Sequence, residues 1–87
     1  MQFTHYDLQQ LKVGQVVQVQ LSGNAANVKL MDSVNFNNYR NGRRHTYYGG
    51  YVTKTISSLS IPNSGHWHLT VDLGGYPGSV RSSINVS

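Results

Sequence analysis

The chain has 87 residues, of which 38% are hydrophobic and only 11% are charged, against about 25% charged residues in an average soluble domain. Seven basic against three acidic residues give a net charge of +4 at pH 7, a value ordinary for a small soluble domain and insufficient to indicate a nucleic-acid-binding protein. The absence of cysteine excludes a disulfide framework and a thiolate metal site, and no stretch approaches the roughly 20 apolar residues of a membrane-spanning helix.

The first third of the chain predicts three strands and a short helical turn. A strand begins near residues 3–5, and the segment DLQQLK follows, where Asp7 is a candidate helix cap and Gly14 a stop. Hydrophobic and polar residues alternate over 17–21, which predicts a strand with one buried face, and NVKLM (27–31) predicts another.

The middle of the chain predicts a connection shaped by local side-chain hydrogen bonds. In LMDSVNFNNYRNG, the side chains of Asp32 and Asn35 are placed to bond nearby backbone amides, and a second helical turn would close at Gly42. Asp72, which precedes two glycines, has the same pattern. We therefore expect structural roles for these residues.

The second half predicts four more strands: 47–55, interrupted by two glycines, then 59–61, 66–73 and 80–86. The clearest is HWHLTVDLGG, where odd positions from 67 to 73 are hydrophobic and even positions from 66 to 72 are polar. This alternation predicts one buried face and one polar, half-exposed face.

Together these segments predict an all-β fold, an antiparallel, jelly-roll-like β-sandwich of about six to eight short strands with at most one or two helical turns, in one domain over residues 1–87. Neutral polar residues, the lack of Glu and the scarcity of Ala all disfavour long helices. The expected core consists of inward-facing residues: Phe3, Val17, Val19, Leu21, Val28, Leu30, Leu59, Ile61, Trp67, Leu69, Val71, Val80, Ile84 and Val86.

The positive charge is concentrated in one segment. The remaining charges cancel, so the net +4 is carried by Arg40, Arg43, Arg44 and Lys54, and three of these lie in NYRNGRRHTYYGGY. Guanidinium groups among aromatic rings can hold a phosphate, a carboxylate, a sugar or a base. The candidate ligand-binding residues are Tyr39, Arg40, Arg43, Arg44, His45, Tyr47 and Tyr48. The alternative is a structural connection whose tyrosines cover a thin core.

Metal binding and catalysis have weaker support. His66 and His68 share a strand face, a spacing that suits two imidazole ligands, but few residues remain to complete a zinc site, so we expect no metal and no cofactor. Without Glu or Cys, and with three widely separated aspartates, paired-carboxylate and Cys-His chemistry have little basis. We expect no enzymatic activity.

Several blocks resemble a bacterial family of small β-sandwich proteins classified as a domain of unknown function. They are FTHYDL, NVKLMD, NFNNYRNGRR, YYGG, IPNSGHWHLTVDLGG and SSINV, in this order over nearly the whole chain. Members of that family occur alone or before a Toll/interleukin-1-receptor-like (TIR) domain. The resemblance implies a compact sandwich that, without a TIR segment, acts alone or through a separate partner.

The expected function is recognition of an anionic or carbohydrate-like ligand, or of a protein partner, by the basic, Tyr-rich surface. One alternative is a nucleic-acid-binding protein, which is less favoured because four excess cations are few for a protein that follows phosphates. The other is a structural or homo-oligomeric β-sandwich without a small ligand. The N-terminus lacks the pattern of a secretory leader, so we expect a cytoplasmic protein without membrane contact.

Overall fold

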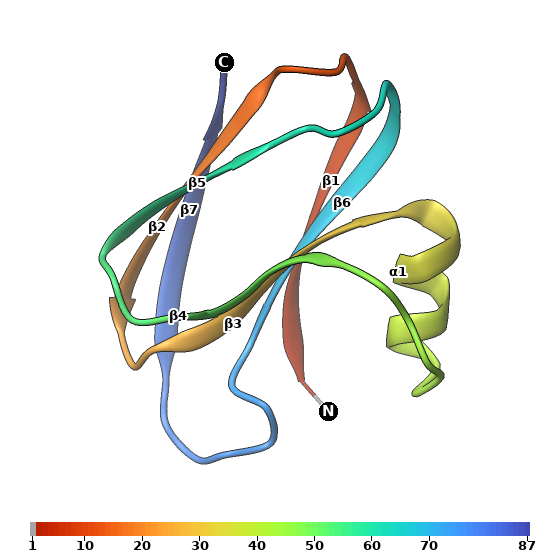
Figure 1. Cartoon of the computed structure of the whole chain (residues 1–87). Coiled ribbons are helices and arrows are strands. Elements are labelled where there is room, and N and C mark those ends of the chain that lie inside the picture. Colours follow the sequence, from red (N-terminus) through yellow and green to blue (C-terminus); the bar gives the residue numbers. More distant parts are fainter. Residues whose placement is uncertain (1) are drawn as a thin grey trace.

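Seven strands and one helix are formed by residues 2–87, the part of the chain that the computed structural model describes (Figure 1). In chain order they are β1 (Phe3–Leu11), β2 (Val16–Gly23), β3 (Ala26–Asp32), α1 (Ser33–Arg40), β4 (Tyr48–Val52), β5 (Ile56–Ser60), β6 (Gly65–Asp72) and β7 (Val80–Val86). No helix within this range has the length and apolar character needed to cross a membrane.

The strands form two antiparallel sheets, with orders β1-β6-β3-β4 and β5-β2-β7. The pairings are nested: β3 pairs with β4, β2 with β5, and β1 with β6, as in a long hairpin that has been rolled up. This nesting is the jelly-roll arrangement with fewer strands, and β7 extends the second sheet beside β2. The predicted all-β, jelly-roll-like sandwich is confirmed.

The main core lies between the two sheets and consists of side chains that alternate inward along the strands. It contains Leu8, Leu11, Val17, Val19, Leu21, Ala26, Val28, Leu30, Ile61, Trp67, Leu69 and Val71. The predicted members Leu59, Val80, Ile84 and Val86 pack against this cluster while half-buried. The Trp67 indole also donates a hydrogen bond from Nε1 to the Asn63 carbonyl at 2.8 Å, which satisfies its one polar atom.

A bulge in β1 replaces the helical turn predicted for DLQQLK, and that prediction was wrong. The register against β6 shifts between Asp7 and Gln9, and Gln9 has a left-handed φ of 61°. Because side chains alternate along a strand, a regular β1 would place Leu8 and Leu11 on opposite faces. The extra residue of the bulge shifts the alternation by one position. Both leucines therefore reach the core while Asp7 stays on the outer face.

Helix α1 lies on the outer face of the four-stranded sheet, away from β2, β5 and β7 (Figure 1). The Asp32 side chain caps it by accepting from the Asn35 amide at 2.9 Å, as expected of these two residues. A second buried cluster forms beneath the helix from Met31, Phe36 and Tyr39, with Phe3 against it. Phe3 was predicted in the main core, but its position on β1 places it on this other face of the sheet.

The helix also covers most of the outer face of β6, which the alternation predicted to be half-exposed. His68, Thr70 and Asp72 are buried, and only His66 remains partly accessible. Strand β6 is thus buried on both faces. Its outer face is not half-exposed as predicted, because the connection between β3 and β4 folds back over the sheet.

Candidate functional site

The predicted Arg-Tyr segment occupies the last turn of α1, the connection over 41–47 and the start of β4. Arg40, Arg43 and Arg44 are exposed, and Tyr47 is exposed to 43%. The guanidinium of Arg40 lies 5.7 Å from the centre of the Phe36 ring, and a hydrogen bond from the Arg43 amide to the Asn38 carbonyl closes the helix end. We call these neighbouring groups of the chain, together with Lys29, the basic loop surface: Arg40, Arg43, Arg44, His45, Tyr47 and Lys29.

Lys29 joins this surface from the outer face of β3, and sequence reasoning missed it because its charge is formally cancelled along the chain. Its Nζ lies 4.6 Å from the centre of the Tyr47 ring and 5.0 Å from that of Tyr39. Nζ also contacts His45 Nε2 at 3.2 Å. Because an ammonium only donates, Nε2 accepts, and Nδ1 then carries the proton donated to the Arg43 carbonyl at 3.1 Å. These contacts link the connection to the sheet.

Tyr39 does not belong to the exposed surface, because it is only 4% exposed and its hydroxyl donates to Asp72 Oδ2 at 2.6 Å. Burial raises the pKa of Tyr39, and the hydrogen bond to Asp72 adds to that rise. For Asp72, burial alone would raise the pKa, but hydrogen bonds from Tyr39, Asn27 and the Gly74 amide, together with the charge of Lys29, lower it. The expected structural role of Asp72 is therefore confirmed.

The arginines of the basic loop surface have no carboxylate partner. Within residues 2–87, His66 and Asp7 form the one contact of ion-pair length. Asp72 is already occupied by three hydrogen-bond donors, and Asp32 caps α1. The surface therefore keeps its positive charge and presents bidentate donors to solvent, which is what an anionic ligand requires.

Tyr48 faces a different environment from the rest of the predicted residues. Its register partner is Leu30, an inner-face residue, and its ring packs at 6.1 Å against Trp67. It lines a hollow of about 230 Å³ whose wall also includes Asn35, Thr46 and His66. A larger hollow of about 920 Å³, between the start of β1 and residues 73–80, has no positively charged lining residue and does not suit an anion.

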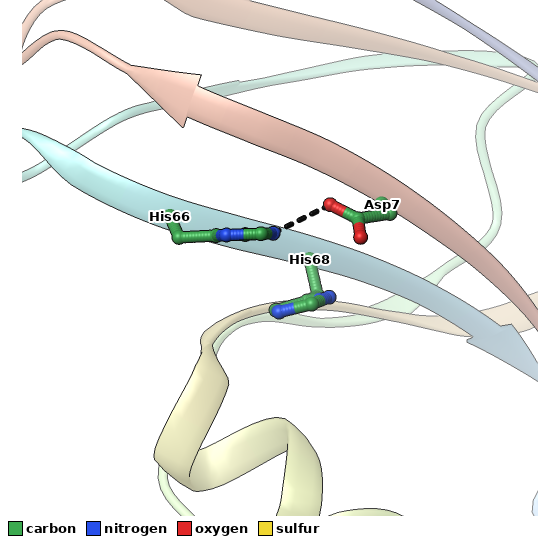
Figure 2. Close-up of side chains that lie close together, drawn as sticks. All are labelled: Asp7, His66 and His68. Atoms are coloured by element: carbon green, nitrogen blue, oxygen red, sulfur yellow. Dashed lines mark hydrogen bonds and ion pairs between the residues drawn. The ribbon is translucent and has the colours of Figure 1, made fainter.

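A second group of polar side chains lies on the outer faces of β1 and β6 (Figure 2). His66 Nε2 donates to Asp7 Oδ1 at 2.6 Å, and His68 is the direct register partner of Asp7. His68 Nδ1 and His5 Nε2 form a hydrogen bond at 2.9 Å, in which one nitrogen donates and the other accepts. His68 Nε2 forms a hydrogen bond of the same length with the Ser33 hydroxyl. The sequence placed His66 and His68 on one face, but not beside His5 and Asp7.

The surroundings of His5 and His68 disfavour the charged forms of both imidazoles. Burial lowers the pKa of His68, and partial burial lowers that of His5. The Gln9 amide, followed by His66, lowers the pKa of Asp7. The Phe36 ring stacks on both His5 and His68, with centroid distances of 4.1 and 4.6 Å, so the helix holds both rings in place.

The comparisons with known proteins identify a family for this fold. A family described as "Domain of unknown function (DUF1883)" matches residues 1–87. No curated protein and no solved structure matches the chain. Because the match covers the full length of the sequence, the chain belongs to the DUF1883 family of domains of unknown function.

Proposed function

We propose that this protein is a non-enzymatic recognition module whose basic loop surface binds a small anionic ligand. The observation that carries the proposal is the set of exposed guanidinium groups of Arg40, Arg43 and Arg44, which have no carboxylate partner within residues 2–87. Arg binds phosphate and carboxylate groups through two parallel hydrogen bonds, and the Tyr47 ring offers a flat face beside them.

The way the surface is supported favours binding over an accidental charge cluster. Lys29 is held between the Tyr39 and Tyr47 rings and contacts His45, so one cation is already oriented before a ligand arrives. Preorganised groups lose less conformational entropy on binding. The layer beneath them, in which Tyr39 is bonded to Asp72, connects the surface to the sheet.

The resemblance to bacterial proteins with this domain alone or before a TIR domain fits the same proposal. In this interpretation the protein is a bacterial, cytoplasmic module that recognises a ligand. A carbohydrate or a protein partner that carries carboxylate or phosphate groups would use the same contacts.

A thermal-shift screen with nucleotides, sugar phosphates, acidic sugars and oligonucleotides tests the proposal, since a ligand that binds only the native state raises the melting temperature. An Arg43→Ala/Arg44→Ala double variant should lose the shift caused by any hit while melting close to wild type. The matched control is Lys12→Ala/Arg81→Ala, which removes the same charge from two exposed positions elsewhere. It should keep the shift.

Three results would count against the proposal. Equal loss of binding in both double variants would show that only net charge matters. A collapse of the melting temperature in the Arg43/Arg44 variant would assign these arginines a structural role. A shift obtained only with oligonucleotides, falling steeply with salt, would identify a nucleic-acid-binding protein instead.

Size-exclusion chromatography at two protein concentrations distinguishes the recognition module from the remaining alternative, a structural homo-oligomer. A structural, homo-oligomeric sandwich predicts an elution volume that changes with concentration and no hit in the screen. A monomer with a ligand-dependent shift supports recognition.

A further inference from the structure

The geometry points to a site for a divalent transition-metal ion, with Zn²⁺ as the reference ion, formed by Asp7, His66 and His68 on the outer face of the four-stranded sheet. One ligand atom from each of the three residues lies within 4.8 Å of the other two. Figure 2 shows the three side chains on the same side of β1 and β6, the side on which α1 lies. None of these three ligands belongs to the basic loop surface, although Arg40 of that surface lies over the Phe36 ring that stacks on His68.

The strands themselves bring the ligands together. His66 and His68 are two residues apart on β6 and therefore point to the same face, and Asp7 is directly opposite His68 on β1. In a tetrahedral zinc site with bonds of about 2.0–2.1 Å, ligand atoms lie roughly 3.3 Å apart. The His66–Asp7 contact of 2.6 Å is shorter than this value, while the separations within the group extend up to 4.8 Å, so the side chains have to rotate to enclose an ion.

Two of the ligands are accessible from solvent, and the third is buried. The side chains of His66 and Asp7 are 37% and 42% exposed. His68 is buried between the Phe36 ring and its hydrogen-bond partners His5 and Ser33. Both ring nitrogens of His68 are engaged, so Nδ1 has to exchange its hydrogen bond with His5 for the ion. The remaining bond between Nε2 and the Ser33 hydroxyl would then orient the ring. The site thus combines one preorganised ligand with two accessible ones.

The bulge in β1 is an independent observation, because it orients the Asp7 carboxylate. The left-handed φ of 61° at Gln9 is unfavourable for a residue other than glycine, and the Gln9 amide donates to Asp7 Oδ1 at 3.0 Å. Bulges often redirect a side chain next to a functional site. An exposed ion pair between His66 and Asp7 contributes little to stability, so stability alone does not account for this arrangement.

The ligand types select the class of metal. Two imidazoles and one carboxylate suit Zn²⁺, Co²⁺ or Ni²⁺, whereas Mg²⁺ and Ca²⁺ prefer sets of oxygen ligands. Three protein ligands leave a fourth position for water or for an exogenous group.

Titration of the tag-free, chelator-treated protein with ZnCl₂ by isothermal titration calorimetry tests the proposal. Wild type should bind one Zn²⁺ per chain, and CoCl₂ should give visible absorption bands of a low-coordinate complex. His66→Gln and Asp7→Asn should each weaken binding about tenfold or more, and both change accessible side chains that leave the core intact. His45→Gln is the matched control, since His45 contacts Lys29 rather than this cluster, and it should bind as wild type does.

Zinc-dependent shifts of imidazole NMR signals locate the ion without a variant. Shifts confined to His66, His68 and their neighbour His5 support the site. Absence of binding at millimolar ZnCl₂, equal affinity in His66→Gln and wild type, or a preference for Mg²⁺ over Zn²⁺ would each overturn it.

Discussion

Replacing Tyr39 by Phe removes one buried oxygen atom and should destabilise the whole sandwich. The Tyr39 hydroxyl donates to Asp72 Oδ2 at 2.6 Å, while Asn27 Nδ2 and the Gly74 amide both donate to Oδ1. Oδ2 therefore loses its donor in the variant. A hydrogen bond to a charged group contributes about 1.5–3 kcal/mol net, so we expect a loss of about 2 kcal/mol.

The assay is urea unfolding at pH 7 followed by circular dichroism, together with thermal melting. In a domain of this size, 1 kcal/mol corresponds to about 4–8 °C, so the melting temperature should fall by roughly 8–16 °C. Tyr47→Phe is the control, because the Tyr47 side chain is largely exposed and its change should stay within about 0.5 kcal/mol.

The pH dependence of this difference tests the cause. The pKa of Asp72 in the folded protein lies below its ordinary value of 3.8, so the unfolded chain takes up the proton first as the pH falls. The stability that Asp72 contributes is present above pH 3.8 and is lost as the pH drops through its folded pKa. The gap between Tyr39→Phe and wild type should therefore narrow in acid. A gap that is absent at pH 7, or that widens below pH 4, would refute the reasoning.

Substitutions at three further places in the chain test the fold. Trp67→Ala should cost about 3–5 kcal/mol in urea unfolding, because Trp67 is only 6% exposed in the main core, and a wild-type midpoint would remove it from that core. Asp32→Ala should cost about 1 kcal/mol through loss of the α1 cap, whereas Asp32→Asn should retain most of it; equal effects would contradict a capping role. Gly49→Ala should lower the melting temperature more than Gly50→Ala, since a Cβ at Gly49 would clash with the Val28 carbonyl oxygen, whereas a Cβ at Gly50 would have no atom within 4 Å. The reverse order would mean that the β3–β4 pairing differs from the one described.

Alternation of side chains was sufficient to predict the strands and most of the core. Residues 17–21 lie within β2 and residues 67–71 lie within β6, and their hydrophobic side chains point inward, as expected. The signal was strong there because a half-buried strand has a period of two, which few other structures share.

The same reasoning failed at β1 for a specific physical reason. Leu8 and Leu11 are three residues apart, a spacing that matches one turn of helix, and Asp7 precedes them as a cap would. A bulged strand produces the same spacing, because the extra residue shifts the alternation by one. Only the pairing with β6 distinguishes the two, and that pairing is a long-range contact that a local pattern does not contain.

The composition of the two sites was predictable to different degrees. The exposed arginines were evident because all three lie within residues 40–44. The burial of Tyr39 and the participation of Lys29 depend on α1 folding back over the sheet, which no local pattern showed. His5 and Asp7 precede His66 and His68 by about 60 residues, so only the register of β1 against β6 brings the four together.

The connection between β3 and β4 is topologically dispensable, since these strands are adjacent and antiparallel and a tight turn could join them. Yet residues 33–47 carry all three arginines of the basic loop surface, and α1 contributes the Phe36 ring that covers His68. Relatives could therefore exchange this one insertion and acquire a new specificity without rebuilding the sandwich. The constraint on such an exchange is the outer face of β6, where any replacement must again shield Thr70 and Asp72 from water.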